Sequence, residues 1–127
     1  MITIKTKILA LLSLLGLLFF TSDSPTKKNF SGVHFKPDGA KFYGLNFKGL
    51  EVIECNLPII WDLSSAEFSA ALDVSAQTPT PEYIAVESDG TKLWLTERTS
   101  TRVFEYGFST PWKLRSAFFL VAHEPVQ

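Results

Sequence analysis

The stretch KPDGAKFY at residues 36–43 recurs as ESDGTKLW at 87–94, and EVIECNLPIIWDLSSAEF at 51–68 recurs as RVFEYGFSTPWKLRSAFF at 102–119. Both pairs are offset by 51 residues without a gap. Across residues 32–69, ten of 38 aligned positions are identical, including an Asp-Gly pair and a tryptophan. Chance does not explain this agreement, so the chain contains two similar structural units.

Each unit has the pattern of short antiparallel strands. An Asp-Gly pair between two strands is typical of a tight hairpin, because glycine accepts the positive φ of such a turn. Strands are expected over 33–35, 41–45, 51–57 and 67–72, and over 84–86, 92–96, 102–108 and 118–123. Alternation predicts one core face on the third strand of each unit. Its residues are Ile53, Cys55 and Leu57, matched by Phe104, Tyr106 and Phe108, whereas Val52, Glu54 and Asn56 lie on the other face.

These units resemble the β-propeller repeats of bacterial and phage extracellular proteins, relatives of the YVTN and WD-repeat-like propellers. The resemblance rests on KPDGAKFY and ESDGTKLW, and on VIECNLPIIWDLSSA at 52–66 and VFEYGFSTPWKLRSA at 103–117. It implies an all-β fold of antiparallel four-stranded blades, about two in this chain. Three positions depart from the repeat pattern: Cys55 replaces an aromatic residue, Lys113 replaces the Asp after Trp112, and Ser88 replaces a proline.

The number of repeats limits what the chain can build alone. Propellers have about 4 to 8 blades, and two blades leave open edges and apolar faces. Three alternatives remain: a truncated gene product, a protomer that closes a ring with copies of itself or with a partner chain, or a small open sandwich.

The N-terminal region has the pattern of an export signal. Lys5 and Lys7 precede the apolar run Ile8–Phe20, which is shorter than the roughly 20 residues of a membrane-spanning helix. We expect residues 1–24 to be a signal peptide or an uncleaved anchor, 25–31 a linker, 32–81 the first repeat and 82–127 the second. The expected location is secreted, periplasmic or at the cell surface.

Composition excludes several classes of protein. Apolar residues make up 46% of the chain and the net charge is −1, so the sequence favours a folded domain and gives no electrostatic reason to bind nucleic acid. The single cysteine, Cys55, excludes an intrachain disulfide, and with His34 and His123 it does not make a zinc-ligand pattern. We expect no metal and no cofactor.

The strongest catalytic candidates are Glu54 and Glu105, which are identical across the repeats and flanked by apolar residues. Two carboxylates at a suitable separation can hydrolyse a glycosidic bond. The alternative is that each pairs with Lys or Arg on a neighbouring strand. His34 and His123 do not recur in the other repeat, and Cys55 aligns with a predicted core position, so neither histidine nor the thiol is expected to act in catalysis.

The aromatic positions have two interpretations. Four aromatic residues occupy matched positions in the two repeats: Tyr43 and Trp94, and Trp61 and Trp112. They would form a sugar-stacking platform if exposed, or core contacts if buried. Because each occupies the place of its counterpart in the other repeat, the core interpretation is favoured. We therefore expect an exported, non-catalytic propeller-type module whose partners are further blades, an extracellular protein or a glycan. The alternative function is a fragment of an extracellular carbohydrate-active enzyme.

Overall fold

A computed structural model describes residues 28–124 of the chain as two four-stranded antiparallel sheets. Sheet 1 has the strand order β1-β2-β3-β4 and sheet 2 the order β5-β6-β7-β8. The strands are β1 (Phe30–Phe35), β2 (Lys41–Asn46), β3 (Glu51–Asn56), β4 (Glu67–Asp73), β5 (Pro81–Val86), β6 (Lys92–Glu97), β7 (Val103–Phe108) and β8 (Ala117–His123). Two 3-10 turns, η1 (Leu63–Ser65) and η2 (Leu114–Ser116), precede β4 and β8. The expected antiparallel all-β fold is confirmed, and the described residues form no closed ring.

The expected signal or anchor at 1–24 lies outside the described residues, as do residues 25–27 of the expected linker; the last two residues of that linker, Phe30 and Ser31, belong to β1. Among residues 28–124, no helix has the length and apolar character needed to cross a membrane.

The repeat seen in the sequence is also a repeat of backbone geometry. Irregularities in pairing occur at Phe30/Gly32 and Glu54/Cys55 in sheet 1, and 51 residues later at Pro81/Tyr83 and Glu105/Tyr106 in sheet 2. Four non-glycine residues of the described chain have positive φ, and they form two matched pairs: Leu50 and Thr101, then Trp61 and Trp112. A gapless offset preserves the side of the sheet to which each side chain points.

The two Asp-Gly hairpins are confirmed. Gly39 and Gly90 both have φ of +75°. The preceding carboxylates, those of Asp38 and Asp89, each accept a hydrogen bond of 2.9 Å from the backbone N–H two residues later. The indole of Trp61 lies where a Cβ on Gly39 would be, and Trp112 lies in the same relation to Gly90. Glycine is therefore required by both the dihedral angle and the tryptophan contact.

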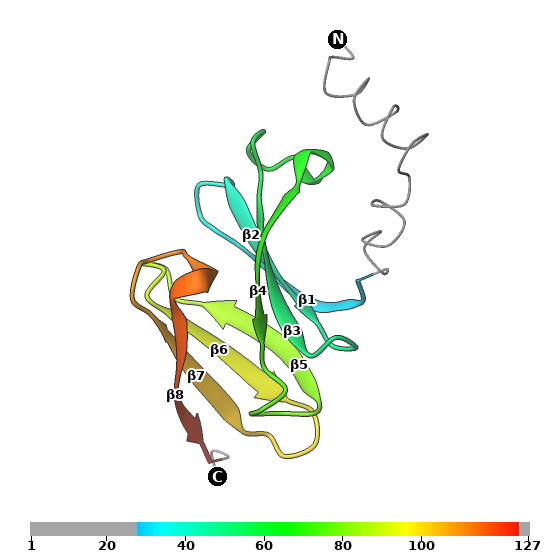
Figure 1. Cartoon of the computed structure of the whole chain (residues 1–127), viewed down its shortest axis with the longest axis vertical. Helices are drawn as coiled ribbons and strands as arrows, with labels where there is room; N and C mark the ends of the chain where they lie inside the picture. Colours follow the sequence, from blue (N-terminus) through cyan, green and yellow to red (C-terminus); the bar gives the residue numbers. More distant parts are fainter. Residues whose placement is uncertain (1–27, 125–127) are drawn as a thin grey trace, which may run out of the picture.

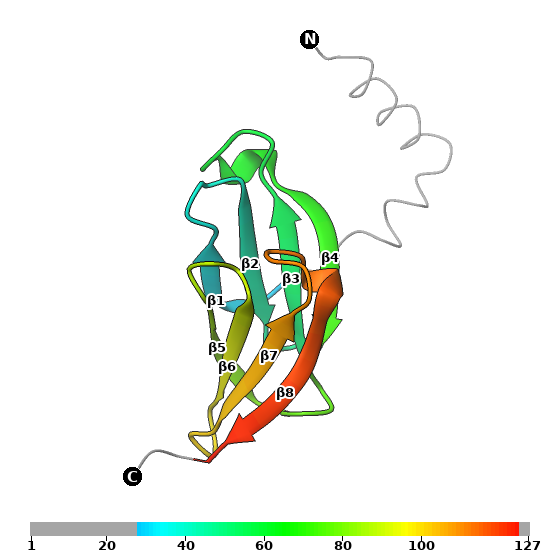
Figure 2. The same cartoon turned by 90° about the vertical axis from the view of Figure 1, so that its left-hand side faces the viewer.

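Sheet 1 packs against sheet 2 through opposite faces of the two repeats (Figures 1 and 2). Sheet 2 uses the predicted core face, because Phe104, Tyr106 and Phe108 all belong to the shared core. Sheet 1 contributes the other face, on which Tyr43, Leu45, Val52 and Ala70 are buried.

The prediction of a single core face on the third strand is therefore wrong for sheet 1. Val52 and Ile53 are adjacent and point to opposite faces, yet they are 0% and 2% exposed. Glu54, assigned to the non-core face, is also buried. The reason is that Val52 faces sheet 2, whereas on the opposite face the ring of Phe30 lies over Gly44, the cross-strand partner of Ile53. Burial of both faces removes the alternation on which the prediction relied.

Strands β1 and β5 lie against each other at the edges of the two sheets. A Cβ on Gly32 would be 3.3 Å from the backbone nitrogen of Ile84, so the missing side chain allows this close approach. At the other side of the stack, η2 contacts β4. The space between the sheets at that side holds a polar cluster around Glu54.

Candidate functional site

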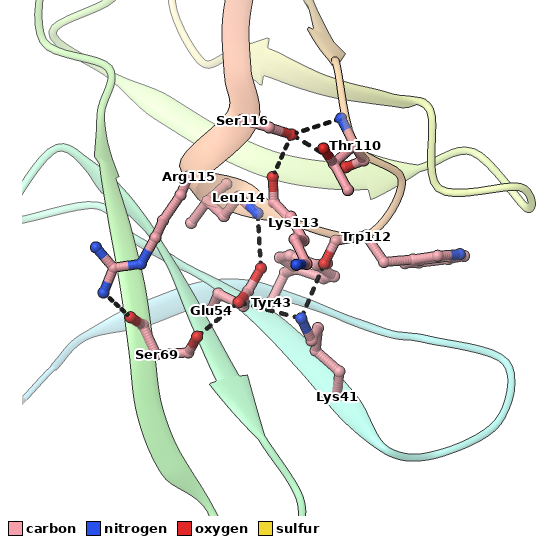
Figure 3. Close-up of polar contacts among 10 residues, drawn as sticks. All are labelled: Lys41, Tyr43, Glu54, Ser69, Thr110, Trp112, Lys113, Leu114, Arg115 and Ser116. Atoms are coloured by element: carbon pink, nitrogen blue, oxygen red, sulfur yellow. Dashed lines mark hydrogen bonds and ion pairs between the residues drawn. The ribbon is translucent and has the colours of Figure 1, made fainter.

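A polar cluster between the sheets is built around Glu54 (Figure 3). Strand β3 places Glu54 on the face toward sheet 2, beside Tyr43 of β2 and Ala70 of β4. Oε1 accepts a hydrogen bond of 2.7 Å from Ser69 and lies 3.1 Å from Nζ of Lys41. Oε2 accepts a hydrogen bond of 2.7 Å from the backbone N–H of Leu114. A buried carboxylate with these donors is fully compensated.

The backbone carbonyl of Trp112 is the second centre of this cluster. It accepts hydrogen bonds from the hydroxyl of Tyr43 at 2.7 Å and from Nζ of Lys41 at 2.9 Å. Burial, and then the nearby Glu54 carboxylate, raise the pKa of Tyr43, so its hydroxyl stays protonated and donates. The positive φ of Trp112 shapes the turn that presents this carbonyl. Together, Glu54 and the Trp112 carbonyl join sheet 1 to the η2 turn of sheet 2.

A groove of about 360 Å³ opens beside the cluster. Its lining residues are Lys41, Glu54, Asn56, Ser69, Lys113 and Arg115. Arg115 donates a hydrogen bond of 2.7 Å to the backbone carbonyl of Ser69, which fixes its guanidinium across the groove. With three cationic side chains and one carboxylate, the lining carries a net positive charge.

Glu105 occupies the same repeat position as Glu54 but lies in a different environment. It alternates on β7 with the core residues Phe104 and Tyr106, and so points to the outer face of sheet 2. Nζ of Lys92 lies 2.9 Å from Oε1, and Oε2 contacts Nε2 of His123 at 3.0 Å and accepts from Nε1 of Trp94 at 3.3 Å. Hydrogen bonds from Lys92 first, and then from His123, lower the pKa of Glu105 to about 2.

The two candidate catalytic carboxylates are therefore not brought together. Glu54 faces the contact between the sheets, whereas Glu105 faces away from it. Each is paired with a lysine of the neighbouring strand, Lys41 or Lys92. This is the pairing arrangement considered as the alternative to catalysis.

The remaining candidates do not form a catalytic or metal-binding group. His34 lies on β1, where burial lowers its pKa. Cys55 is half-buried, and its pKa is raised by burial and then by Glu54, which keeps it a thiol. Within residues 28–124, no three His, Cys, Asp or Glu side chains are placed to hold a metal ion.

The aromatic residues separate into different environments. Tyr43 is 0% exposed, Trp94 and Trp112 are half-buried, and Trp61 is 55% exposed. Trp112 lies under Nζ of Lys36, 5.8 Å from the ring centroid, and beside Tyr43. The core interpretation holds for Tyr43, but the two equivalent tryptophans do not have equal exposure.

Sequence reasoning missed Ser69 and Arg115 as members of the cluster, and noted Lys113 only as a departure from the repeat pattern. A signal was present, because Lys113 and Arg115 stand where the first repeat has Asp62 and Ser64. Two cations gained at one turn indicate a contact that the equivalent turn does not make.

Comparisons with known proteins show similarity of fold alone. No family model matches the chain, and no curated protein matches it. A functionally unknown protein from Desulfotomaculum acetoxidans DSM 771 is 19% identical with a TM-score of 0.54, over 73% of this chain and 26% of that one. A structure described as a "putative 6-phosphogluconolactonase" from Bacteroides uniformis ATCC 8492 is 14% identical with a TM-score of 0.57, over 80% of this chain and 29% of that one. The chain thus spans between a quarter and a third of these two structures.

Proposed function

We propose that this chain is an exported, non-catalytic interaction module made of two propeller-type blades, whose open faces are completed by further blades. Three features support the proposal: two four-stranded antiparallel sheets, a gapless repeat of 51 residues, and the resemblance of both repeats to extracellular propeller repeats. The stacking of sheet 1 on sheet 2 through opposite faces is what successive blades require, because each blade then offers one used and one free face.

The observation that carries this proposal is the exposure of large apolar side chains at the turn after β3. These are Ile59 (61% exposed), Ile60 (59%), Trp61 (55%) and Leu63 (56%), here named the η1 turn surface. Exposed apolar groups that are contiguous in this way are a mark of protein interfaces. The equivalent turn in sheet 2 packs on sheet 1, which shows what kind of contact such a turn makes.

The placement of the carboxylates supports a non-catalytic role. A retaining or inverting glycosidase needs its two carboxyl groups on either side of one bond, about 5 to 10 Å apart across a shared cleft. Glu54 faces the inner side of sheet 2 and Glu105 lies on its outer side. Each carboxylate is also paired with a lysine, Lys41 or Lys92. We expect the chain to hydrolyse no aryl glycoside above background. Turnover that is lost in Glu54→Gln and in Glu105→Gln would favour the enzyme alternative instead.

Sedimentation of the full chain across a dilution series tests the interaction role. We expect a mass above that of one chain at high concentration, falling toward one chain on dilution, because the open faces associate. A compact, cooperatively melting monomer at every concentration would contradict the incomplete-propeller proposal. Non-ionic detergent is present throughout to cover the apolar run Ile8–Phe20, so that the measured association comes from the sheets and not from this run.

Export is part of the same proposal and rests on Lys5, Lys7 and the apolar run that follows them. Fractionation of expressing cells tests it. Recovery of the full-length chain from the cytosol alone would contradict export.

A further inference from the structure

The two 3-10 turns have the same place in the repeat but different surroundings. Leu114 in η2 is 2% exposed because sheet 1 covers it, whereas Leu63 in η1 is 56% exposed. Both turns have a tryptophan of positive φ two residues before the leucine, Trp61 and Trp112. The η1 turn therefore has the same backbone form as a turn that docks on a sheet. No sheet formed by residues 28–124 covers Leu63 as sheet 1 covers Leu114.

The outer face of sheet 2 offers the matching receptor. Lys92 and Glu105 repeat Lys41 and Glu54, and they form the same ion pair, at 2.9 Å against 3.1 Å. The position of Ala70, 3% exposed beneath η2, is taken in sheet 2 by Val121, which is 41% exposed. The Lys–Glu ion pair beside η2 on sheet 1 is thus repeated on sheet 2, where Oε2 of Glu105 contacts Trp94 and His123 of its own sheet and no turn of residues 28–124.

We infer that a second copy of this chain docks its η1 turn on the outer face of sheet 2, in the position that η2 takes on sheet 1. The backbone N–H of Leu63 donates to the carboxylate of Glu105, and Nζ of Lys92 donates to the carbonyl of Trp61. This inference rests on the proposed function, in which open faces recruit further blades, and it adds the partner and the contacts.

Charge complementarity favours a second copy as the occupant. At the contact within the chain, Lys113, which immediately precedes η2, lines the same groove as Lys41, so two cations lie together there. At the proposed contact, Asp62 takes the place of Lys113 and Lys92 takes the place of Lys41. An acid then faces a cation, which selects this turn for this receptor. Asp62 is already oriented, since its Oδ1 accepts hydrogen bonds from the backbone N–H and the hydroxyl of Ser64.

The contact between copies also lacks two features that favour the contact within the chain. Trp94 replaces Tyr43 and has no hydroxyl to donate to the Trp61 carbonyl, and Tyr83 stands where Gly32 allows β1 and β5 to approach closely. We therefore expect the contact between copies to be reversible and weaker than the packing of sheet 1 on sheet 2. Because each copy uses two different surfaces, the association is head-to-tail and extends unless a ring closes.

Blocking one surface at a time tests this arrangement. Leu63→Arg blocks the turn and Val121→Arg blocks the receptor, and both side chains are exposed enough for the fold to tolerate the change. Leu120→Arg, at the exposed position equivalent to Ser69, is a second receptor variant. Thr99→Arg adds the same charge to an exposed loop away from both surfaces and is the matched control. The readout is fluorescence-detected sedimentation of a labelled full chain in detergent.

We expect Leu63→Arg and Val121→Arg to be monomeric when alone at concentrations where the wild type and Thr99→Arg associate. Mixed, they should form a dimer that does not extend, because the first retains a free receptor and the second a free turn. If the wild type associates but Val121→Arg and Leu120→Arg associate equally well, or the mixture stays monomeric, the head-to-tail inference is wrong while the interaction role stands. A wild type that is monomeric at every concentration overturns both.

Discussion

The carboxylate of Glu54 in β3 accepts a 2.7 Å hydrogen bond from the backbone N–H of Leu114, 60 residues later in the chain. This contact is buried and links sheet 1 to the turn that begins the last strand of sheet 2. Its residue, Glu54, is 3% exposed, so the charge is held by Lys41 and by hydrogen bonds rather than by water. The side chain of Glu54 thus contributes directly to the packing of sheet 1 on sheet 2.

Replacing Glu54 should loosen the contact between the sheets. Glu54→Ala leaves Lys41 without its partner and the Leu114 N–H without its acceptor, and losing one member of a buried pair costs roughly 3 to 5 kcal/mol. Glu54→Gln keeps an oxygen acceptor and should cost less. Urea unfolding followed by tryptophan fluorescence measures the loss.

Glu105 supplies the control for this prediction, since it has the same repeat position and the same lysine pairing but lies on the outer face. Glu105→Ala should destabilise the chain clearly less than Glu54→Ala. Equal losses for the two variants would mean that the Leu114 contact contributes nothing beyond the ion pair.

Alanine substitution should lower the free energy of unfolding more at Gly90 than at Gly39. Both have φ of +75°, which alone makes Gly→Ala cost on the order of 1 kcal/mol. A new Cβ would also overlap the indole of Trp61 or Trp112. Trp61 is 55% exposed and packs on Phe35, whereas Trp112 is half-buried and held between Lys36 and Tyr43, so it has less room to shift. We expect about 1 kcal/mol for Gly39→Ala and about 2 to 3 kcal/mol for Gly90→Ala, where strain and overlap add.

Chemical unfolding of both variants and of the neighbouring Ala40→Gly control decides this prediction. Equal losses at Gly39 and Gly90 would show that the tryptophan contact is not restrictive. The sequence alone predicts equal losses, since it shows two identical Asp-Gly pairs.

Local pattern was enough to predict the strands and the two turns. Asp38-Gly39 and Asp89-Gly90 specify the hairpins through backbone sterics, which depend on a few adjacent residues. The offset of 51 residues then predicts that the second unit repeats the first, and the bulges and positive φ values agree.

Packing between the sheets could not be read from the same pattern. Alternation on β3 indicates which residues share a face, but not which face meets another sheet, and both Val52 and Ile53 proved to be buried. The Glu54 cluster depends on a backbone N–H and a backbone carbonyl of the η2 turn, which leave no trace in residue identity. In the sequence, only Lys113 and Arg115, which replace Asp62 and Ser64 of the first repeat, indicated that the second turn has a distinct environment.

Glu105 should make the stability of the chain depend on acidic pH. Its pKa is lowered from 4.5 to about 2, by hydrogen bonds from Lys92 first and then from His123. Between these values the unfolded chain binds a proton that the folded chain does not, so stability falls as pH decreases through this range. In Glu105→Gln this contribution is absent, and the free energy of unfolding should change less steeply there.

The measurement is the difference in unfolding free energy between the wild type and Glu105→Gln, from urea titrations between about pH 6 and pH 2. The pKa values of Asp38, Asp89 and Glu97 are also lowered, by contacts that remain in both proteins, so they cancel in this difference. The wild-type advantage should be constant above about pH 5.5 and shrink below it, and about 1 M salt should reduce it because the lysine pair is partly exposed. A difference that stays constant down to pH 2 would show that Lys92 and His123 do not stabilise the ionised Glu105 in solution.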